Sequence, residues 1–597
     1  MLKKVFGQYF TPMMVCNYMV QLGLRSFEKR AISVLDPSCG RGNFLVACIE
    51  NFNRFLGRKN FQLELWGIEI DNIELSNAVA ILSSTREQYE TSGFQIVLNL
   101  LNHDFFEILF ERPPSFPDYF DIIIGNPPYV RHELILNKEE FRKRICFINS
   151  RYEENGYRCG TTAEHCYNCK KTSYVPLGSK ADMYCYFITA ATKLLVNQGL
   201  LLFIIPTKWL YSNYGLKLRE FIINNFKIDS LILVEKNLFP GVLVDSIIVE
   251  LRKETNDKKR NSNVLNYAML ETITNGQVMS NIPCITNHRK IVQENLRGSK
   301  NWYRYLEQPA FLEQVLKQRE FIPLGDSKLS QVKWGLKTGA ENFFFLTSRQ
   351  IKEYQIPSEF LKPAIKSPKD LFKDNGHHLY SCLLVIPPME KNELPAGILK
   401  YINLGEQMQL NKRASIKSRK PWYSISVNKI PDIIVPNFIW QARLLFLENT
   451  ERVIPSYNFH TIHLTDQSYS NYLLALLNSS FGELFLELFG RSEGGGVLHL
   501  QTCDLTDIPI LDPTTVIFSE KQELEGLYIE LHELASKPQE DFKLFEKTKK
   551  SLDECISALF TQDSGHISKK SDELFKQIRE QVSKLRYRRI NRAKRQQ

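Results

Sequence analysis

The sequence has few cysteines, no long apolar run and no fixed-period repeat. Twelve cysteines in 597 residues, most of them isolated in apolar stretches, exclude a disulfide-stabilised scaffold and favour buried thiols in a reducing compartment. The longest apolar run, Leu200 to Pro206, is far shorter than the ~20 residues that a membrane-spanning helix needs. Residues 1–14 lack the continuous apolar core of a signal peptide. We therefore expect a cytoplasmic protein with no membrane partner.

Positive charge is concentrated at the C-terminus. The net charge is +10, from 76 Lys and Arg against 66 Asp and Glu. From Lys569 to Gln597 there are 11 basic and 3 acidic residues, a balance of +8, so the rest of the chain carries only +2. Such a tail fits an anionic polymer or phosphate-bearing partner, and it fits a solvated helix equally well.

Short β-branched or aromatic runs alternate with helical stretches between residues 33 and 250. Helices are predicted over residues 43–56, 72–90, 182–197 and 214–225. The alternation predicts an α/β fold with a doubly wound, mostly parallel Rossmann-like sheet, whose ligands bind beyond the carboxyl ends of the strands. The predicted strands are Ser33–Asp36, Leu63–Glu69, Phe94–Leu98, Phe120–Ile124, Leu200–Pro206, Leu231–Glu235 and Ile247–Leu251.

The rest of the chain differs in composition and in its predicted secondary structure. A charged, Asn-rich loop opens a connecting segment, residues 253–324. Shorter strands with more Pro, Trp and Tyr predict an α+β domain over residues 325–515, and a long helical pattern over residues 516–597 ends in the basic tail. Residues 1–252 form the first of the four expected segments.

The first motif that indicates chemistry is VLDPSCGRGNF, residues 34–44, which is a strand, a glycine turn and a helix start. Glycines allow a ligand close to the backbone, and a helix N-terminus favours a carboxylate or phosphate. The pattern is not G-x-G-x-x-G, which disfavours a nicotinamide dinucleotide. A tight turn without a ligand is the alternative interpretation.

Acidic residues follow the next two strands. Glu69 stands where an acid can bind both ribose hydroxyls of a nucleoside. Asp104 can accept a hydrogen bond from an adenine amino group, with Phe105 packing on the ring. Singly, each acid is more often a solvated loop residue, but in this order behind a glycine turn they indicate a nucleoside site.

The most specific motif is Asn126-Pro127-Pro128-Tyr129, which follows an apolar strand. Two prolines fix the backbone and remove two donors, so nearby carbonyls are left to accept hydrogen bonds. The Asn126 side-chain oxygen and the Pro127 carbonyl can bind both hydrogens of one NH2 group, which localises the nitrogen lone pair for attack on a sulfonium methyl. Tyr129 can stack on a planar base. The alternative is a simple cap and turn.

Together with GQYFTP, residues 7–12, these motifs occur in the order found in one enzyme family. The sequence resembles the γ group of adenine-N6 DNA methyltransferases, the TaqI-like family, over most of residues 1–252 and into the second domain. The resemblance implies a site-specific enzyme of a restriction–modification system that moves a methyl group from S-adenosylmethionine to a flipped adenine. It implies two partners, double-stranded DNA and a separate cognate endonuclease that acts on the same site.

The resemblance assigns roles to matching positions. Asn126, Pro127 and Tyr129 would hold the target base, and Phe239 would cover its other face unless it is a core residue. The residues expected to bind the cofactor are Phe10, Thr11, Asp36, Gly40, Glu69, Ile70, Asp104, Phe105 and Asn126.

The second domain resembles the family's specificity domain at VKWGLKTGAEN, residues 332–342, at LLNSS, residues 476–480, and at the glycine run 494–496. Basic and aromatic residues alternate over residues 412–423, which favours a DNA-contacting loop, although an ordinary basic surface loop is equally compatible. The expected DNA contacts are Lys337, Thr338, Lys417, Arg419, Lys420 and Trp422.

A cysteine-rich stretch lies between Tyr129 and Met183. Its spacing is irregular, so a structural zinc site and a loop of free thiols both remain open. The candidate ligands are Cys159, Cys166 and Cys169, with a fourth from His165, Cys146 or Cys185.

Three alternatives share some of these features. A protein-glutamine methyltransferase also acts on a planar NH2 group, but it needs neither the second domain nor the basic tail. A catalytically silent DNA-binding subunit would not need Asp36, Glu69, Asp104 and Asn126 intact. A fused nuclease is not expected, because only six residues precede the Gly7 motif and no nuclease-type acidic cluster is evident. A stand-alone modification enzyme is therefore favoured.

Overall fold

The computed structural model describes residues 10–25, 29, 31–56, 62–90, 95–109, 111–135, 141, 177–234, 246–272, 283–299, 301–371, 381–427, 429–439, 444–492, 496–535, 542–561 and 569–594. It divides into two compact units, Met1–Leu306 and Glu307–Gln597. Each unit is described by itself below. The expected division of function among four segments stays a prediction.

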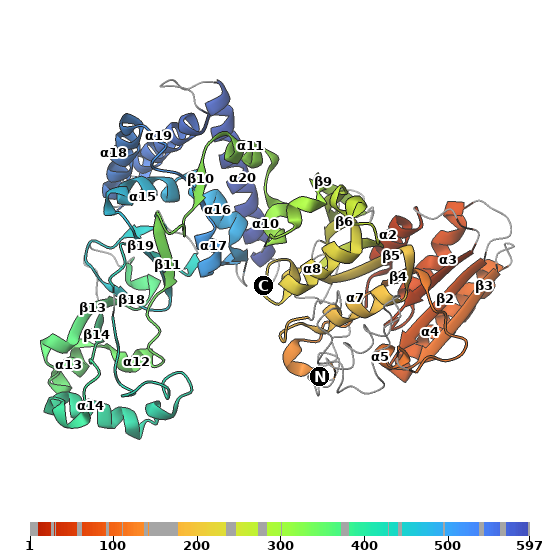
Figure 1. Ribbon diagram of the computed structural model, residues 1–597, viewed down its shortest axis with the longest axis horizontal. Helices are drawn as coiled ribbons and strands as arrows, with labels where there is room; N and C mark the ends of the chain where they lie inside the picture. The colour runs from red at the N-terminus through yellow and green to blue at the C-terminus, as the bar shows by residue number, and fades with distance from the viewer. Residues whose placement is uncertain are drawn as a thin grey trace. The chain divides into compact units, whose positions relative to one another are not determined.

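The first unit is built on one nine-stranded sheet with the strand order β3-β2-β1-β4-β5-β7-β6-β8-β9 (Figure 1). Strands β7 and β9 run antiparallel to their neighbours, and the other pairings are parallel. Every strand predicted from residues 33 to 251 is present, and two further strands extend the sheet. The strands are β1 (Ala31–Asp36), β2 (Gln62–Glu69), β3 (Gln95–Asn102), β4 (Phe120–Gly125), β5 (Leu195–Pro206), β6 (Phe226–Val234), β7 (Ser246–Lys253), β8 (Val264–Thr272) and β9 (Pro283–Val292).

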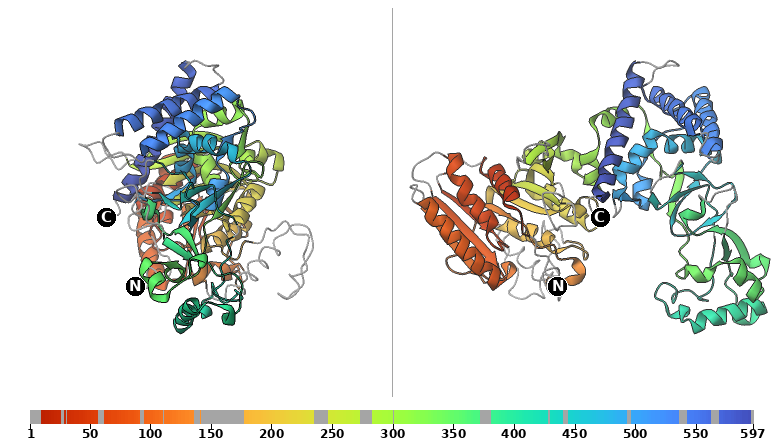
Figure 2. Two further views of the ribbon diagram at one scale, coloured as in Figure 1. Left: turned by 90° about the vertical axis from the view of Figure 1, so that its left-hand side faces the viewer. Right: turned by 180° about the vertical axis from the view of Figure 1, so that it is seen from behind.

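Helices cover both faces of this sheet, as a doubly wound α/β fold requires (Figures 1 and 2). Successive residues of a strand point to opposite faces, so Val34 packs in one core with α2, α3 and α4, and Leu35 packs in the other with α5, α7 and α8. The helices are α2 (Met13–Leu24), α3 (Asn43–Leu56), α4 (Asn72–Glu90), α5 (Phe105–Ile108), α7 (Met183–Lys193), α8 (Gly215–Asn225), α9 (Asp257–Asn261) and α10 (Trp302–Glu307), with short 3-10 helices η1 (His132–Leu134), η3 (Thr207–Leu210) and η5 (Gln293–Leu296).

Several predicted boundaries were wrong, since β3 continues to Asn102 and β5 and β6 begin earlier than predicted, at Leu195 and Phe226. The helix expected over residues 182–197 ends at Lys193, because Leu195 pairs with Phe120 and begins β5. Pairing in the central sheet outweighs the local helical pattern of residues 194–197.

The second unit contains four smaller sheets, with the orders β10-β22, β11-β19-β15-β17, β12-β14-β13-β18 and β16-β21-β20. Its strands are β10 (Phe321–Pro323), β11 (Ser330–Trp334), β12 (Phe345–Leu346), β13 (Leu361–Ile365), β14 (Ser381–Leu384), β15 (Ile433–Pro436), β16 (Phe438–Ile439), β17 (Leu447–Glu448), β18 (Ile454–Pro455), β19 (Phe459–Leu464), β20 (Arg491–Ser492), β21 (Leu498–His499) and β22 (Pro509–Leu511). Its helices are α11 (Ala310–Gln318), α12 (Glu341–Phe344), α13 (Ser348–Tyr354), α14 (Ala396–Gln407), α15 (Ser470–Asn478), α16 (Ser480–Phe489), α17 (Thr502–Thr506), α18 (Phe518–Ala535), α19 (Phe542–Thr561) and α20 (Lys569–Lys594).

Two cores hold this unit together. Helices α15, α16, α18, α19 and α20 pack with strands β15, β19 and β22, and helices α12 and α14 pack with strands β12, β13 and β14 (Figure 1). No single described helix is long and apolar enough to cross a membrane, although the bent pair Gln467–Asn478 and Ser480–Phe489 meets the length and composition criteria jointly.

The basic C-terminal helix α20 pairs part of its charge within the unit. Arg586 binds Glu483 at 3.0 Å, and Arg589 binds Glu487 at 2.8 Å and the Gly496 carbonyl. Arg589 and Glu487 are both almost fully buried. These two arginines are therefore structural.

Candidate active site

The candidate site lies where the central strands end. Asp36 is the last residue of β1, Glu69 the last of β2 and Gly125 the last of β4, and β1 lies between the other two strands. The order of connections reverses at β1, since β2 and β3 lie on one side and β4 and β5 on the other. Ligands of open α/β sheets bind at such a switch point, beyond the carboxyl ends of the strands.

Asp36 is the most buried acid of this edge, with 1% of its surface exposed. Its Oδ1 accepts a hydrogen bond from the Ser38 N–H at 3.1 Å, and its Oδ2 has no hydrogen-bond partner among the described residues. Burial, opposed by the Ser38 hydrogen bond and aided by the nearby Glu69 carboxylate, raises the pKa of Asp36 to about 8. A Cβ atom on Gly125 would lie 2.7 Å from Asp36 Oδ1, so only glycine lets β4 approach this carboxyl so closely.

Glu69 joins the glycine loop to the end of β2. Its Oε2 accepts from the Gly40 N–H and its Oε1 from the Asp71 N–H, both at 2.9 Å. Gly40 has a φ of 52°, which most other residues rarely adopt. Each carboxylate oxygen has a further lone pair for a ligand hydroxyl.

Residues 10 and 11 border the same loop. The Thr11 carbonyl accepts from Asn43 Nδ2 at 2.9 Å, while the buried Thr11 Oγ1 has no hydrogen-bond partner in the part of the chain described here. Phe10 is exposed, and its ring lies 4.6 Å from the Arg41 guanidinium. Ile70 is also exposed. Exposed apolar side chains therefore stand beside buried polar atoms at this edge.

Asp104 and Phe105 have local structural roles. Asp104 caps α5, since its Oδ1 accepts from the Phe106 N–H at 2.7 Å. Phe105 is buried and stacks on Phe187, with ring centroids 5.2 Å apart. The structure thus places Phe105 in the core beneath the site, and its contact with a cofactor ring stays a prediction.

The Asn126–Tyr129 corner is anchored at both ends. The Ser38 hydroxyl donates to the Asn126 carbonyl at 3.4 Å, which places this corner beside the Asp36 loop. The Tyr129 hydroxyl donates to the Ile204 carbonyl at 3.2 Å, and its ring is half-buried. Neither Ser38 nor Gly125 was predicted as a site residue, although Ser38 lies within the motif of residues 34–44 and Gly125 directly precedes Asn126.

Several predicted residues lie outside the described part of the chain, namely Phe239, Cys146, Cys159, His165, Cys166 and Cys169. Cys185, the remaining candidate zinc ligand, is fully buried in α7, and this burial raises the pKa of its thiol. Within the described ranges no three His, Cys, Asp or Glu side chains are grouped as metal ligands. The structure therefore gives the expected zinc site no support.

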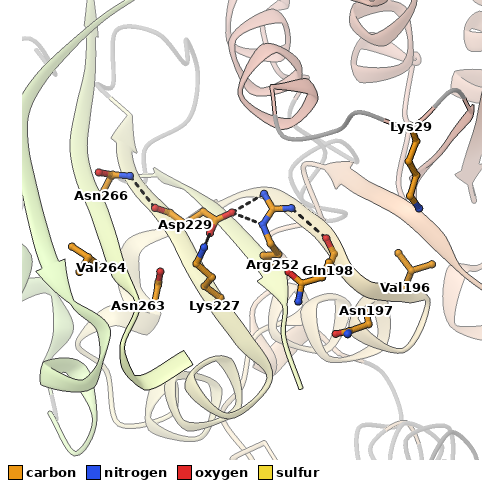
Figure 3. A pocket seen from close by; sticks show the side chains of 10 residues that line it. All are labelled: Lys29, Val196, Asn197, Gln198, Lys227, Asp229, Arg252, Asn263, Val264 and Asn266. Carbon is orange, nitrogen blue, oxygen red and sulfur yellow. Dashed lines mark hydrogen bonds and ion pairs between the residues drawn. The ribbon is translucent and has the colours of Figure 1, made fainter. Parts of the chain in front are cut away.

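A cavity of about 680 Å³ lies at the opposite end of the sheet, where β5, β6 and β8 begin (Figure 3). Its cations are already paired within the protein. Arg252 binds Asp229 at 2.7 Å and Lys227 lies 3.5 Å from the same carboxylate, while Lys29 binds Asp121 at 2.5 Å. We therefore place the candidate site at the carboxyl edge.

In the second unit, two predicted DNA-contacting segments meet. Lys337, Arg419 and Lys420 line one cavity of about 360 Å³, and Arg419 Nη2 donates to the Lys337 carbonyl at 3.0 Å. The buried Arg419 Nη1 has no hydrogen-bond partner among residues that the structure describes. Burial lowers the pKa of Arg419, which indicates a desolvated guanidinium suited to an anion.

The other three predicted contacts differ in exposure. Lys417 is exposed, whereas Thr338 is fully buried. Trp422 is also buried, donating from its indole nitrogen to Glu406 at 3.0 Å and packing 5.7 Å from Phe343. Thr338 and Trp422 thus lie beneath the loops, and direct contact of these two with DNA stays a prediction.

Comparison with known proteins points to one class of enzyme. Residues 53–239 match the family model for the Eco57I restriction-modification methylase, and residues 299–535 match the C-terminal domain of Type II methyltransferase M.Eco57I. The chain is 24% identical over 542 residues to Type II methyltransferase M.AccI of Acinetobacter calcoaceticus, covering 88% of this chain and 89% of the relative. It is 22% identical over 575 residues to Type II methyltransferase M.BstVI of Geobacillus stearothermophilus, covering 87% and 92%.

The chain is also similar to the solved structure of the type IIG restriction endonuclease BpuSI, at 16% identity and a TM-score of 0.44, covering 98% of this chain and 67% of that one. A likeness of this strength carries no functional conclusion. The family models and the sequence relatives support a DNA methyltransferase of a restriction–modification system.

Proposed function

We propose that this relative of Type II methyltransferases methylates N6 of adenine in double-stranded DNA, with S-adenosylmethionine as methyl donor. It would protect one recognition site from a separate cognate endonuclease. The observation that carries the proposal is the position of the Asn126–Tyr129 corner. Ser38 joins that corner to a loop that contains the buried Asp36 and contacts Glu69.

The residues at the carboxyl edge fit a cationic nucleoside. Thr11 Oγ1 and Asp36 Oδ2 are buried polar atoms that lack hydrogen-bond partners within the described ranges, which favours a ligand that satisfies them. Glu69 has the lone pairs to accept ribose hydroxyls, and the exposed Phe10 and Ile70 offer apolar surface to a purine. Bound there, S-adenosylmethionine would supply an electrophilic methyl group on a positively charged sulfur.

Asn126 and Pro127 would activate the adenine amine. The Asn126 side-chain oxygen and the Pro127 carbonyl accept its two hydrogens, so the nitrogen lone pair is withdrawn from the ring and becomes nucleophilic. Methyl transfer would form a new N–C bond and break the S–C bond, leaving a neutral thioether, and the nitrogen would lose one proton to water. This chemistry needs preorganised acceptors and correct orientation more than a strong general base.

The target base must leave the helix to reach this corner. Flipping costs a few kcal/mol, and stacking on aromatic side chains recovers part of that cost. Tyr129 is half-buried, and its hydroxyl is held by Ile204, so the ring has a fixed orientation for stacking. We assign Phe239 to the opposite face of the base.

The second unit would supply the DNA contacts. Lys337, Arg419 and Lys420, which line the 360 Å³ cavity, would bind phosphates, as would the exposed Lys417. Thr338 and Trp422 are buried under these loops, so they would contact DNA only after the loops rearrange.

Sequencing of genomic DNA by a method that reports each modified base tests the proposed function. Cells that express the chain should gain N6-methyladenine at one position of one sequence motif, and cells that express Asn126→Ala should not. Methylated cytosine, or no new modification in cells that contain the folded protein, would contradict the proposal.

A further inference from the structure

The second unit exposes a group of aromatic rings that the proposed function does not use. Trp334 and Phe438 are 47% and 50% exposed, and Tyr457 is 42% exposed. With the His499 ring, these three side chains form what we call the aromatic patch. Exposed aromatic side chains on neighbouring segments are candidates for a binding surface.

The rings of the aromatic patch are connected through neighbouring strands. Trp334 on β11 faces His460 on β19, with ring centroids 4.4 Å apart at 49°. Phe438 on β16 stacks on His499 of β21, with centroids 4.4 Å apart at 13°. His460 Nε2 lies 3.0 Å from the carbonyl of Leu500, the residue after His499.

Tyr457 adjoins the same strands. Its carbonyl accepts a hydrogen bond from the side chain of Asn437, which directly precedes Phe438. The backbone of Asn437 also accepts from the Leu500 N–H at 2.9 Å. The patch is therefore one structural group at the junction of two small sheets.

The backbone next to Trp334 and the ring that it contacts are closely packed. Gly335 follows Trp334, and any Cβ atom there would collide with the Ser456 carbonyl. His460 is fully buried, and burial lowers its pKa to about 4, so its ring is neutral at ordinary pH. Trp334 thus contacts a buried, uncharged ring while 47% of its own surface remains exposed.

The residues that line the cationic cavity begin immediately after the strand that carries Trp334, at Leu336. Lys337, which lines that cavity with Arg419 and Lys420, follows Trp334 by three residues. A site that offers flat rings beside cations matches a nucleic acid, which presents base planes beside phosphates.

We propose that the aromatic patch stacks on bases of the DNA substrate, with Trp334 as the main ring, while Lys337, Arg419 and Lys420 hold the adjacent phosphates. This inference rests on DNA being the substrate in the proposed function. Base–aromatic stacking contributes about 1–3 kcal/mol per base, so loss of the Trp334 ring should weaken DNA binding about 5- to 150-fold. Stacking requires that a base step opens, as occurs where apolar side chains insert into a duplex.

The test is equilibrium DNA binding by the full-length chain without cofactor. The probe is a pool of PCR-amplified, and hence unmethylated, genomic fragments that the wild-type protein retains on a filter. Trp334→Ala and Phe438→Ala remove the rings, and Trp334→Phe keeps an aromatic face. Phe542→Ala is the matched control, because Phe542 is 48% exposed on α19. Thermal unfolding of each variant checks that it is folded.

Salt dependence separates stacking from phosphate contact. Trp334→Ala should lower affinity about 5- to 150-fold with an unchanged slope of log K against log salt, and Trp334→Phe should retain most of the affinity. Lys420→Ala should instead reduce that slope by about 0.9. Phe542→Ala should bind like the wild type.

Wild-type affinity in both Trp334→Ala and Phe438→Ala would overturn the inference. The aromatic patch would then be a candidate binding surface for a protein partner. Failure of the wild-type chain to retain any duplex would overturn it as well. The assay involves no methyl transfer, so its outcome and that of the methylation mapping are independent.

Discussion

The two units build their candidate sites in different ways. In the first unit, Asp36, Glu69 and Asn126 come at the ends of buried parallel strands, so one sheet fixes their relative positions. In the second unit, Lys337 and Arg419 lie on two loops that are far apart in sequence but contact each other in the fold. The first arrangement offers the precision that chemistry needs, and the second offers exposed charge for a large partner.

The electrostatics of the two sites are also opposite. Burial raises the pKa of Asp36 to about 8, so this acid favours a ligand that brings positive charge. Burial lowers the pKa of Arg419, which favours a ligand that brings negative charge. A small cationic cofactor and a polyanion fit these two environments, respectively. Variants that change activity through the first unit without changing DNA binding through the second would test this difference.

The largest effect is expected at the corner that would hold the target amine. Asn126→Ala should lower the methylation rate about 10²- to 10³-fold, because one preorganised acceptor is lost from the transition state. Single-turnover methylation of the mapped motif measures this, and calorimetry should show unchanged cofactor affinity. Asn266→Ala, at the opposite end of the sheet, is the matched control and should change the rate less than twofold. A near-normal rate for Asn126→Ala would remove the basis of the proposed function.

The next effect concerns stability in the second unit. Arg589→Ala should lower the free energy of unfolding by about 3 kcal/mol, because it leaves the buried Glu487 with a weakened ion pair and the Gly496 carbonyl without this donor. Urea unfolding followed by circular dichroism measures the change, and the exposed Lys576→Ala on the same helix is the control. Equal losses in the two variants would show that Arg589 is a solvated tail residue.

Arg589 also shows what sequence reasoning missed. Composition identified a basic tail, but it did not distinguish a charge that contacts DNA from one that pairs with Glu487. In contrast, the central strands of the first unit were predicted, although β3, β5 and β6 are longer than expected, because β-branched runs between helices carry a strong local signal. The same signal placed Asp36, Glu69 and Asn126 at strand ends, where the topology of a parallel sheet brings them together.

Side-chain burial in the second unit depends on tertiary packing and was less predictable. Trp422 was predicted to contact DNA because basic and aromatic residues alternate over residues 412–423, yet it packs against Phe343 and Tyr423. Thr338 was also predicted to contact DNA, and it is fully buried. Local patterns report charge and periodicity, and they do not report which face of an irregular loop meets another segment.

The buried Asp36 of the first unit should make the stability of the ligand-free protein depend on pH. The raised pKa of Asp36 means that the ligand-free folded state holds a proton that the unfolded state releases, so stability from this group falls as pH rises from about 4 to about 8. Asp36→Asn should therefore gain stability relative to the wild type across this range, while binding S-adenosylmethionine about 10- to 100-fold more weakly.

Thermal unfolding of the ligand-free proteins at pH 5 and pH 8 measures the first effect, and calorimetry measures the second. A stability difference that is the same at both pH values would show that Asp36 is already ionised when no ligand is bound. Normal cofactor affinity in the variant would show that the cofactor does not contact this carboxyl.

The smallest effect in this series is expected at Tyr129, whose ring and hydroxyl can be tested separately. Tyr129→Ala should cost about 1–3 kcal/mol of base stacking, whereas Tyr129→Phe loses only the hydrogen bond to the Ile204 carbonyl and keeps the ring. Fluorescence of 2-aminopurine at the target position reports how the base is held once it has left the helix. A change in that signal for Tyr129→Ala, with Tyr129→Phe close to the wild type, identifies the ring as the stacking surface. Equal changes in both variants would mean that the hydroxyl positions the corner and that the ring makes no contact with the base.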